Sequence, residues 1–214
     1  MLDPIATAGL VTREVRTGAR DGEATKITVA RRTYHTTQAD LWDAVTNIER
    51  LPRWFLPIVG DLEVGGRYQL EGNAGGTIER CDAPERFAVT WEFGGMMSWV
   101  DVSLVPAPDG TTLELLHEAS VDPEFWTEYG PGAAGVGWDL GLMGLGLHLE
   151  NGEPVAPEFV DWPTTPDGVV FVRRAATGWA DAAVADGDTP DAAHEAAERT
   201  VEFYTVAPDA VPEG

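Results

Sequence analysis

Hydrophobic and polar residues alternate from Asp61 to Ser120, as they do in antiparallel sheets with one buried face. Val100, Val102 and Leu104 fall on one face, and polar residues stand between them. Glycine pairs and a Pro-Asp-Gly turn separate the alternating segments, as expected of hairpin connections. We therefore predict an antiparallel meander whose apolar face must be covered by another layer.

The segment from Gly132 to Glu150 is predicted to form that cover as one long helix. Its apolar residues surround the helix almost completely, which is typical of a helix buried on all sides. Gly137, Gly141 and Gly144 recur on one flank, although each costs about 1 kcal/mol relative to alanine. Two explanations of these glycines remain equally open: close approach of the helix to the sheet, and space left for a ligand.

Shorter elements precede the meander. The pattern predicts a strand over Lys26–Tyr34, with alternation at residues 11–16 that could add an edge strand. A helix capped by a threonine is expected over residues 37–47, followed by a second short helix over residues 48–54. These two helices would form a collar beside the sheet.

Two alanine-rich helices are expected after the long helix, over residues 167–185 and 189–204. They lack enough large apolar residues for a core of their own. We expect them to pack on the main domain, or against another subunit, through Trp179, Val201, Phe203 and Tyr204.

The patterns thus divide the chain into three parts. Residues 1–25 form an N-terminal arm or edge strand, residues 26–152 form the main domain, and residues 153–214 form a helical extension packed on it.

Composition excludes several partners. The net charge of the 214 residues is −22, and residues 101–214 hold 22 acidic but only three basic residues. Such a surface repels nucleic acid and anionic membranes. The first residues show no signal-peptide pattern, and the lone Cys81, interpreted as a small buried residue, suits a reducing compartment, so we expect a cytoplasmic protein.

Metal and cofactor motifs are not evident in the sequence. The histidines at 35, 117, 148 and 194 show no metal-binding spacing, and the glycine-rich stretches match neither a phosphate loop nor a dinucleotide fingerprint. We therefore expect no metal and no cofactor.

Three motifs indicate a family: Arg50-Leu51-Pro52-Arg53-Trp54-Phe55-Leu56-Pro57, Gly75-Gly76-Thr77-Ile78-Glu79 and Val89-Thr90-Trp91-Glu92-Phe93. With them, residues 26–150 resemble the activator-of-Hsp90-ATPase-homologue-like (AHSA1-like) branch of the SRPBCC, or START/Bet v 1, superfamily. The resemblance implies an α+β helix-grip fold, in which a curved antiparallel sheet wraps around a long helix and leaves a ligand cavity.

The same resemblance leaves the activity open. The family looks like a collection of small-molecule binders, cyclase-like enzymes, stress or resistance proteins and co-chaperone-like domains. The helix pair at 167–205 resembles an extension of some bacterial members. The separate N-terminal domain of eukaryotic Hsp90 activators has no counterpart in this sequence, which makes a chaperone partner the less favoured interpretation.

Candidate site residues are those expected to line or gate such a cavity. Alternation with Leu113 and Leu115 turns His117 inward, where it is either a hydrogen-bonded neutral imidazole or a group that orients or protonates a ligand. The aromatic residues favour an apolar pocket with a few polar groups. The full set is Trp54, Phe55, Tyr68, Trp91, His117, Trp138 and Met143.

The leading hypothesis is that a monomer or homodimer binds or sequesters a hydrophobic or aromatic small molecule. A cyclase or hydrolase that uses His117 as its acid-base group is the second hypothesis, and a protein-interaction module that uses the acidic C-terminal helices is the third.

Overall fold

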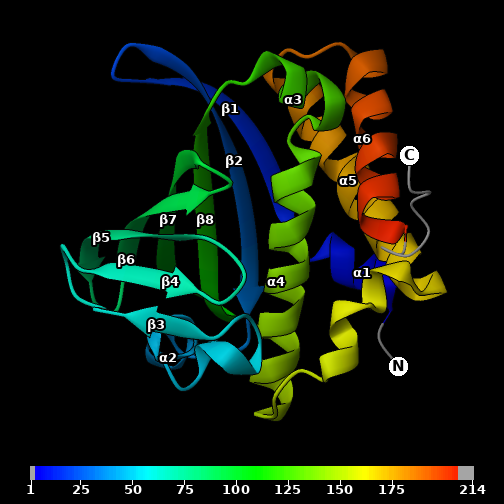
Figure 1. Ribbon diagram of the computed structural model, residues 1–214. Helices are drawn as coiled ribbons and strands as arrows, with labels where there is room; N and C mark the ends of the chain where they lie inside the picture. Colours follow the sequence, from blue (N-terminus) through cyan, green and yellow to red (C-terminus); the bar gives the residue numbers. More distant parts are fainter. Residues whose placement is uncertain (1–2, 207–214) are drawn as a thin grey trace.

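The structure, a computed structural model, describes residues 3–206, except for the side chains of residues 157 and 158. The first two residues of the predicted N-terminal arm and the last eight of the predicted helical extension lie outside the described residues. Its centre is an eight-stranded antiparallel sheet that curves around a long helix (Figure 1). The strand order is β1-β2-β8-β7-β6-β5-β4-β3. The strands are β1 (Thr12–Arg20), β2 (Glu23–Tyr34), β3 (Ile58–Gly60), β4 (Arg67–Leu70), β5 (Gly75–Asp82), β6 (Arg86–Phe93), β7 (Met96–Ala107) and β8 (Gly110–Ser120).

Helices cover the concave face of this sheet in two layers. Figure 1 shows α4 lying between the sheet and the α5–α6 pair. The α-helices are α1 (Pro4–Gly9), α2 (Gln38–Thr46), α3 (Pro123–Tyr129), α4 (Gly132–Asn151), α5 (Pro166–Asp186) and α6 (Pro190–Thr205). The 3-10 turns are η1 (Leu51–Arg53), η2 (Pro157–Val160) and η3 (Trp162–Thr164). None of the described helices is both long enough and apolar enough to cross a membrane.

The alternating pattern places the core as expected. Val102 of β7 lies opposite Leu115 of β8, and Leu104 lies opposite Leu113, with all four side chains buried. Residues 12–20 form the edge strand β1, which continues the sheet through an antiparallel ladder with β2. The α+β helix-grip fold is thereby confirmed.

A buried ion pair fixes α4 between its neighbours. Asp139 is fully buried in the middle of α4. Its carboxylate accepts two hydrogen bonds, both of 3.0 Å, from the guanidinium of Arg13 on β1. It accepts a third, of 2.7 Å, from the indole Nε1 of Trp179 on α5. Three converging donors define both the position of α4 and its rotation about its own axis.

Glycines let the layers around α4 come close. A Cβ at Gly135 would lie 2.4 Å from the indole of Trp179, and one at Gly146 would lie 2.3 Å from the guanidinium of Arg32. A larger residue at Gly135 would overlap the indole, and one at Gly146 would displace the guanidinium of Arg32. Gly141 differs, because a Cβ there would meet only the ring of Phe55, at 3.8 Å.

Two sequence-based details are wrong. The second collar helix is only the three-residue turn η1, because Pro52 removes a backbone donor and Pro57 soon ends the segment. Phe203 was expected to anchor the extension, but it is 61% exposed, with its ring beside that of Tyr129 on α3. Trp179 and Val201 are buried as expected.

We predict opposite effects from alanine at two glycines of α4. Gly135→Ala should lower the free energy of unfolding by about 1–3 kcal/mol, because the methyl group overlaps the Trp179 ring. Gly141→Ala should raise it by up to about 1 kcal/mol, because alanine favours the helix and the space is open. Urea unfolding of both variants measures the difference. Equal changes in the free energy of unfolding of the two variants would contradict both the close contact at Gly135 and the open space at Gly141.

Candidate functional site

A cavity of about 190 Å³ lies between α4 and the concave face of the sheet. Almost every group on its wall is apolar. It reaches the surface at Leu62 and Cys81, which both line it and are exposed. The wall consists of Val45, Thr46, Leu51, Trp54, Phe55, Ile58, Leu62, Tyr68, Leu70, Ile78, Cys81, Phe87, Val89, Trp91, Val100, Val102, Leu113, Leu115, Trp138, Gly141 and Leu142.

Four aromatic rings form a continuous side of this wall. Trp54 and Phe55 follow η1 and stack with their ring centres 5.4 Å apart. Phe55 lies 6.4 Å from Trp138 of α4, which in turn meets the edge of Trp91 of β6 at 5.1 Å. Rings in these arrangements attract one another and offer both faces and edges to a guest molecule.

The collar is anchored to its neighbours on both sides. The indole Nε1 of Trp54 donates a 2.9 Å hydrogen bond to the carbonyl of Ala44 in α2. A Cβ at Gly144 would lie 2.8 Å from the carbonyl oxygen of Trp54, so this glycine permits the close approach of the collar to α4. Gly141, one turn earlier, faces the cavity instead. Gly144 thus permits a close approach to the collar rather than to the sheet, and Gly141 borders open space.

His117 lies behind the aromatic wall rather than in it. It stands on β8 opposite Val100, and its Nδ1 accepts a 3.1 Å hydrogen bond from the Nε1 of Trp138. An indole nitrogen can only donate, so the ring proton of the neutral imidazole must be on Nε2. That Nε2 lies 2.8 Å from the hydroxyl of Ser98, which donates to the carbonyl of Trp91.

This hydrogen-bonded chain joins the two central tryptophans of the wall. It runs in one direction from Trp138 through His117 and Ser98 to the backbone of Trp91. Burial lowers the pKa of His117 to about 4, so the ring is neutral at pH 7. A proton on Nδ1 would break the bond from Trp138. The imidazole therefore orients the aromatic wall and has both nitrogen atoms occupied.

Tyr68 contributes its ring to the cavity and turns its hydroxyl away. The hydroxyl donates a 2.7 Å hydrogen bond to the carbonyl of Thr90 on β6. Burial raises the pKa of Tyr68 above its ordinary value. Its role in the wall is thus that of an aromatic surface.

Met143 does not line the cavity, contrary to the sequence-based expectation. It is fully buried, one helical turn after Asp139, whose carboxylate faces β1 and α5. Residues four apart share a helix face, so Met143 packs away from the cavity. Trp54, Phe55, Tyr68, Trp91 and Trp138 do come together on its wall.

Cys81 was also misjudged from the sequence. It is exposed at the mouth of the cavity instead of buried. It pairs across strands with Phe87, which faces the cavity together with Val89 and Trp91. Phe87, Val89 and Trp91 alternate along β6 and so share one face. Cys81 stands on another strand, and its pairing with Phe87 was needed to place it beside them.

Among the residues that the structure describes, no group of three or more histidine, cysteine or acidic side chains is arranged to hold a metal ion.

Comparisons with known proteins agree with this architecture. The family model described as "Activator of Hsp90 ATPase homolog 1-like protein" matches residues 35–150, from the start of the collar almost to the end of α4. No curated protein matches the chain in sequence.

Solved structures extend the similarity. The solution structure of CalU16 from Micromonospora echinospora has a TM-score of 0.70 at 29% identity and covers 83% of this chain and 97% of CalU16. Its crystal structure has a TM-score of 0.62 and covers 80% and 97%, respectively. EF2215 of Enterococcus faecalis shares the fold, with a TM-score of 0.56 at 18% identity over 81% of this chain and 95% of its own.

We predict that His117 makes stability depend on pH. Its pKa is about 4 in the folded protein, whereas an unperturbed imidazole has a pKa of 6.5. Between these values the unfolded chain binds more protons, so the free energy of unfolding falls by about 3 kcal/mol as the pH drops from 6.5 to 4.

The His117→Gln variant tests this dependence, because glutamine does not titrate. Urea unfolding at pH 7.5, 6.5, 5.5 and 4.5 should show the stability difference between wild type and variant shrinking towards acid pH. A difference that stays constant over this range would contradict the neutral, hydrogen-bonded imidazole.

Proposed function

The chain belongs to the Activator of Hsp90 ATPase homolog 1-like family, and we propose that it binds a small hydrophobic or aromatic molecule in the cavity between α4 and the sheet. The observation behind this proposal is the aromatic wall facing Gly141. At this position the helix lacks a side chain and the space beside it is open. Recessed apolar space with a mouth at the surface is the usual form of a small-molecule site.

The volume sets the size of the guest. An engineered apolar cavity of about 150 Å³ holds benzene. A cavity of about 190 Å³ therefore accommodates one substituted ring or an indole-sized group, with any polar part directed to the mouth at Leu62 and Cys81.

The expected affinity follows from the buried surface. A guest of indole size buries about 250 Å² of apolar surface, which stabilises the complex by about 6 kcal/mol at ~25 cal/mol per Å². Association also costs translational and rotational freedom, so a Kd of tens of micromolar is the tightest that this burial alone would give. Ordered contacts at the mouth would tighten binding further.

Binding has more support than catalysis by His117. An acid-base group must reach the reacting atoms of its substrate. Here the two imidazole nitrogens are engaged by Trp138 and Ser98, and His117 is outside the cavity wall. We therefore assign His117 a positioning role.

Filling the cavity should abolish binding without unfolding the protein. We expect Gly141→Leu to weaken the binding of indole and naphthalene at least about thirtyfold, because the new side chain occupies the guest volume. Isothermal titration calorimetry with each probe measures it, because indole shares the fluorescence of the protein's own tryptophans. The smaller Gly141→Ala change should have an intermediate effect.

The matched control is Ala192→Leu, which adds the same side chain at an exposed position of α6. It should bind both probes as the wild type does. Circular dichroism checks that Gly141→Leu is folded. If the folded variant binds the probes as tightly as the wild type, the guest lies elsewhere and the proposal is refuted.

A further inference from the structure

A cluster of aromatic side chains is exposed on the side of the molecule opposite the sheet. Phe125 of α3 lies 5.3 Å from Tyr129, and Tyr129 lies 5.7 Å from Phe203 of α6, measured between ring centres. Phe125 is 45% exposed and Phe203 61%. We call these three residues the aromatic patch. Large side chains grouped at the surface commonly mark an interaction site.

The backbone under the aromatic patch is held firmly. The guanidinium of Arg199 on α6 donates to the carbonyls of Thr127 and Glu128, at 2.8 and 2.7 Å, and so ties the end of α3 to α6. The hydroxyl of Tyr204 donates to the carbonyl of Ala133 in α4. A partner would therefore meet rings on a preorganised surface, which reduces the entropy lost on binding.

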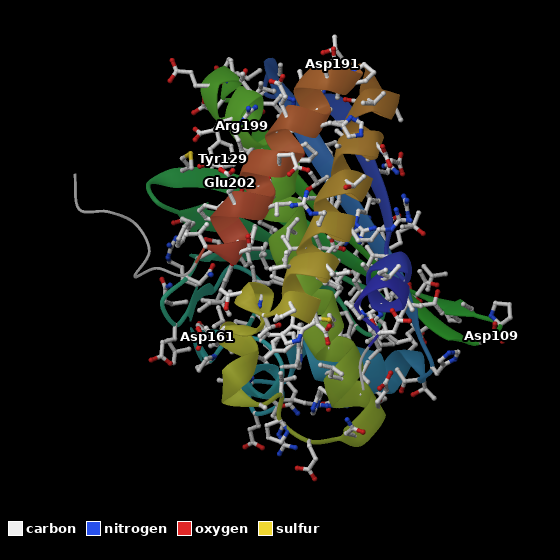
Figure 2. All side chains as sticks on the ribbon, turned by 90° about the vertical axis from the view of Figure 1, so that its right-hand side faces the viewer. Asp109, Tyr129, Asp161, Asp191, Arg199 and Glu202 are labelled. Atoms are coloured by element: carbon white, nitrogen blue, oxygen red, sulfur yellow. The ribbon has the colours of Figure 1, made fainter. Side chains whose placement is uncertain are left out.

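Carboxylates surround these rings. Glu124 and Glu128 are exposed on α3, and Glu195, Glu198 and Glu202 follow one another along an exposed face of α6. Figure 2 shows Tyr129, Arg199 and Glu202 on this one face of the molecule, with Asp191 at the end of the same helix. Two arginines offset part of this charge, because Arg173 pairs with Glu198 and Arg199 lies 3.9 Å from Glu195. The glutamates outnumber them, so the face remains acidic.

We propose that the aromatic patch and its acidic rim dock a basic segment of a partner protein. Arginine and lysine side chains bind both halves of this surface: they stack on aromatic faces through cation–π attraction and pair with carboxylates. The chain already contains one such arrangement beside the patch. There the ammonium of Lys26 lies 5.0 Å from the Trp126 ring centre and 2.6 Å from a carboxylate oxygen of Asp186.

Charge disfavours other occupants of the aromatic patch, namely a second copy of the chain, the chain's own last residues and an anionic membrane. A second copy would bring two acidic faces together, since each chain has a net charge of −22. The chain's own last eight residues, 207–214, contain two acidic residues and no basic one. Anionic membranes are repelled in the same way. A basic protein segment complements both the charge and the apolar character of the surface.

The test uses the full-length chain and a synthetic probe. The probe is a fluorescent 18-residue helical peptide with a leucine stripe and an arginine face, compared with the same peptide carrying glutamate in place of arginine. Anisotropy titrations at 0.15 M salt give the Kd for wild type, Phe203→Ser and Glu202→Lys. Phe93→Ser and Glu63→Lys are matched controls, because Phe93 is exposed on β6 and Glu63 is exposed in the connection between β3 and β4.

We expect the arginine peptide to bind the wild type and the glutamate peptide not to bind. Each patch variant should weaken binding about tenfold or more, whereas each control should change it by less than about twofold. Equal losses in patch and control variants would show that only general acidity attracts the peptide, and no binding of the arginine peptide would also overturn the proposal.

Two further outcomes would assign the patch to another occupant. A wild type that sediments as a dimer, with a monomeric Phe203→Ser variant, would identify a second copy. Tighter peptide binding after removal of residues 207–214 would identify the chain's own end. Glu202→Lys keeps the test valid if Phe203→Ser fails to fold, because it changes an exposed charge alone.

Discussion

The contact among Asp139, Arg13 and Trp179 is the interaction on which the rest of the structure depends. A helix that is apolar on nearly every side has no preferred rotation, because any face can be buried equally well. A buried carboxylate with three directed donors removes this freedom. Buried ion pairs contribute little net stability, but one at this position selects a single arrangement of the layers.

The rotation of α4 decides what the cavity contains. With Asp139 turned to β1 and α5, Trp138 and Gly141 face the sheet. Trp138 then reaches His117, whose hydrogen bonds hold the aromatic wall, and Gly141 leaves open space in front of Phe55. One polar contact on the far side of the helix thus defines the shape of the apolar site on its near side.

The sequence predicted most of the fold because its periods are clear. Alternation defined the strands, helical spacing of apolar residues indicated α5, and the pair Thr189-Pro190 marked the start of α6. It could not predict that Met143 faces away from the cavity, because the apolar residues of α4 surround the whole helix. Asp139 was the signal for the rotation, but its partner Arg13 is 126 residues away and only the fold brings them together. Likewise, alternation turned His117 inward correctly, yet the indole of Trp138 in front of it is a tertiary contact.

The central claim is that the space beside Gly141 is open and apolar in the folded protein. Diffraction from a crystal pressurised with xenon tests it most directly, because xenon enters empty apolar cavities and scatters strongly. The account predicts a xenon atom inside the cavity, against the wall formed by Phe55 and Trp138 and beside Gly141. Side chains that fill this space, with no xenon bound there, would contradict it.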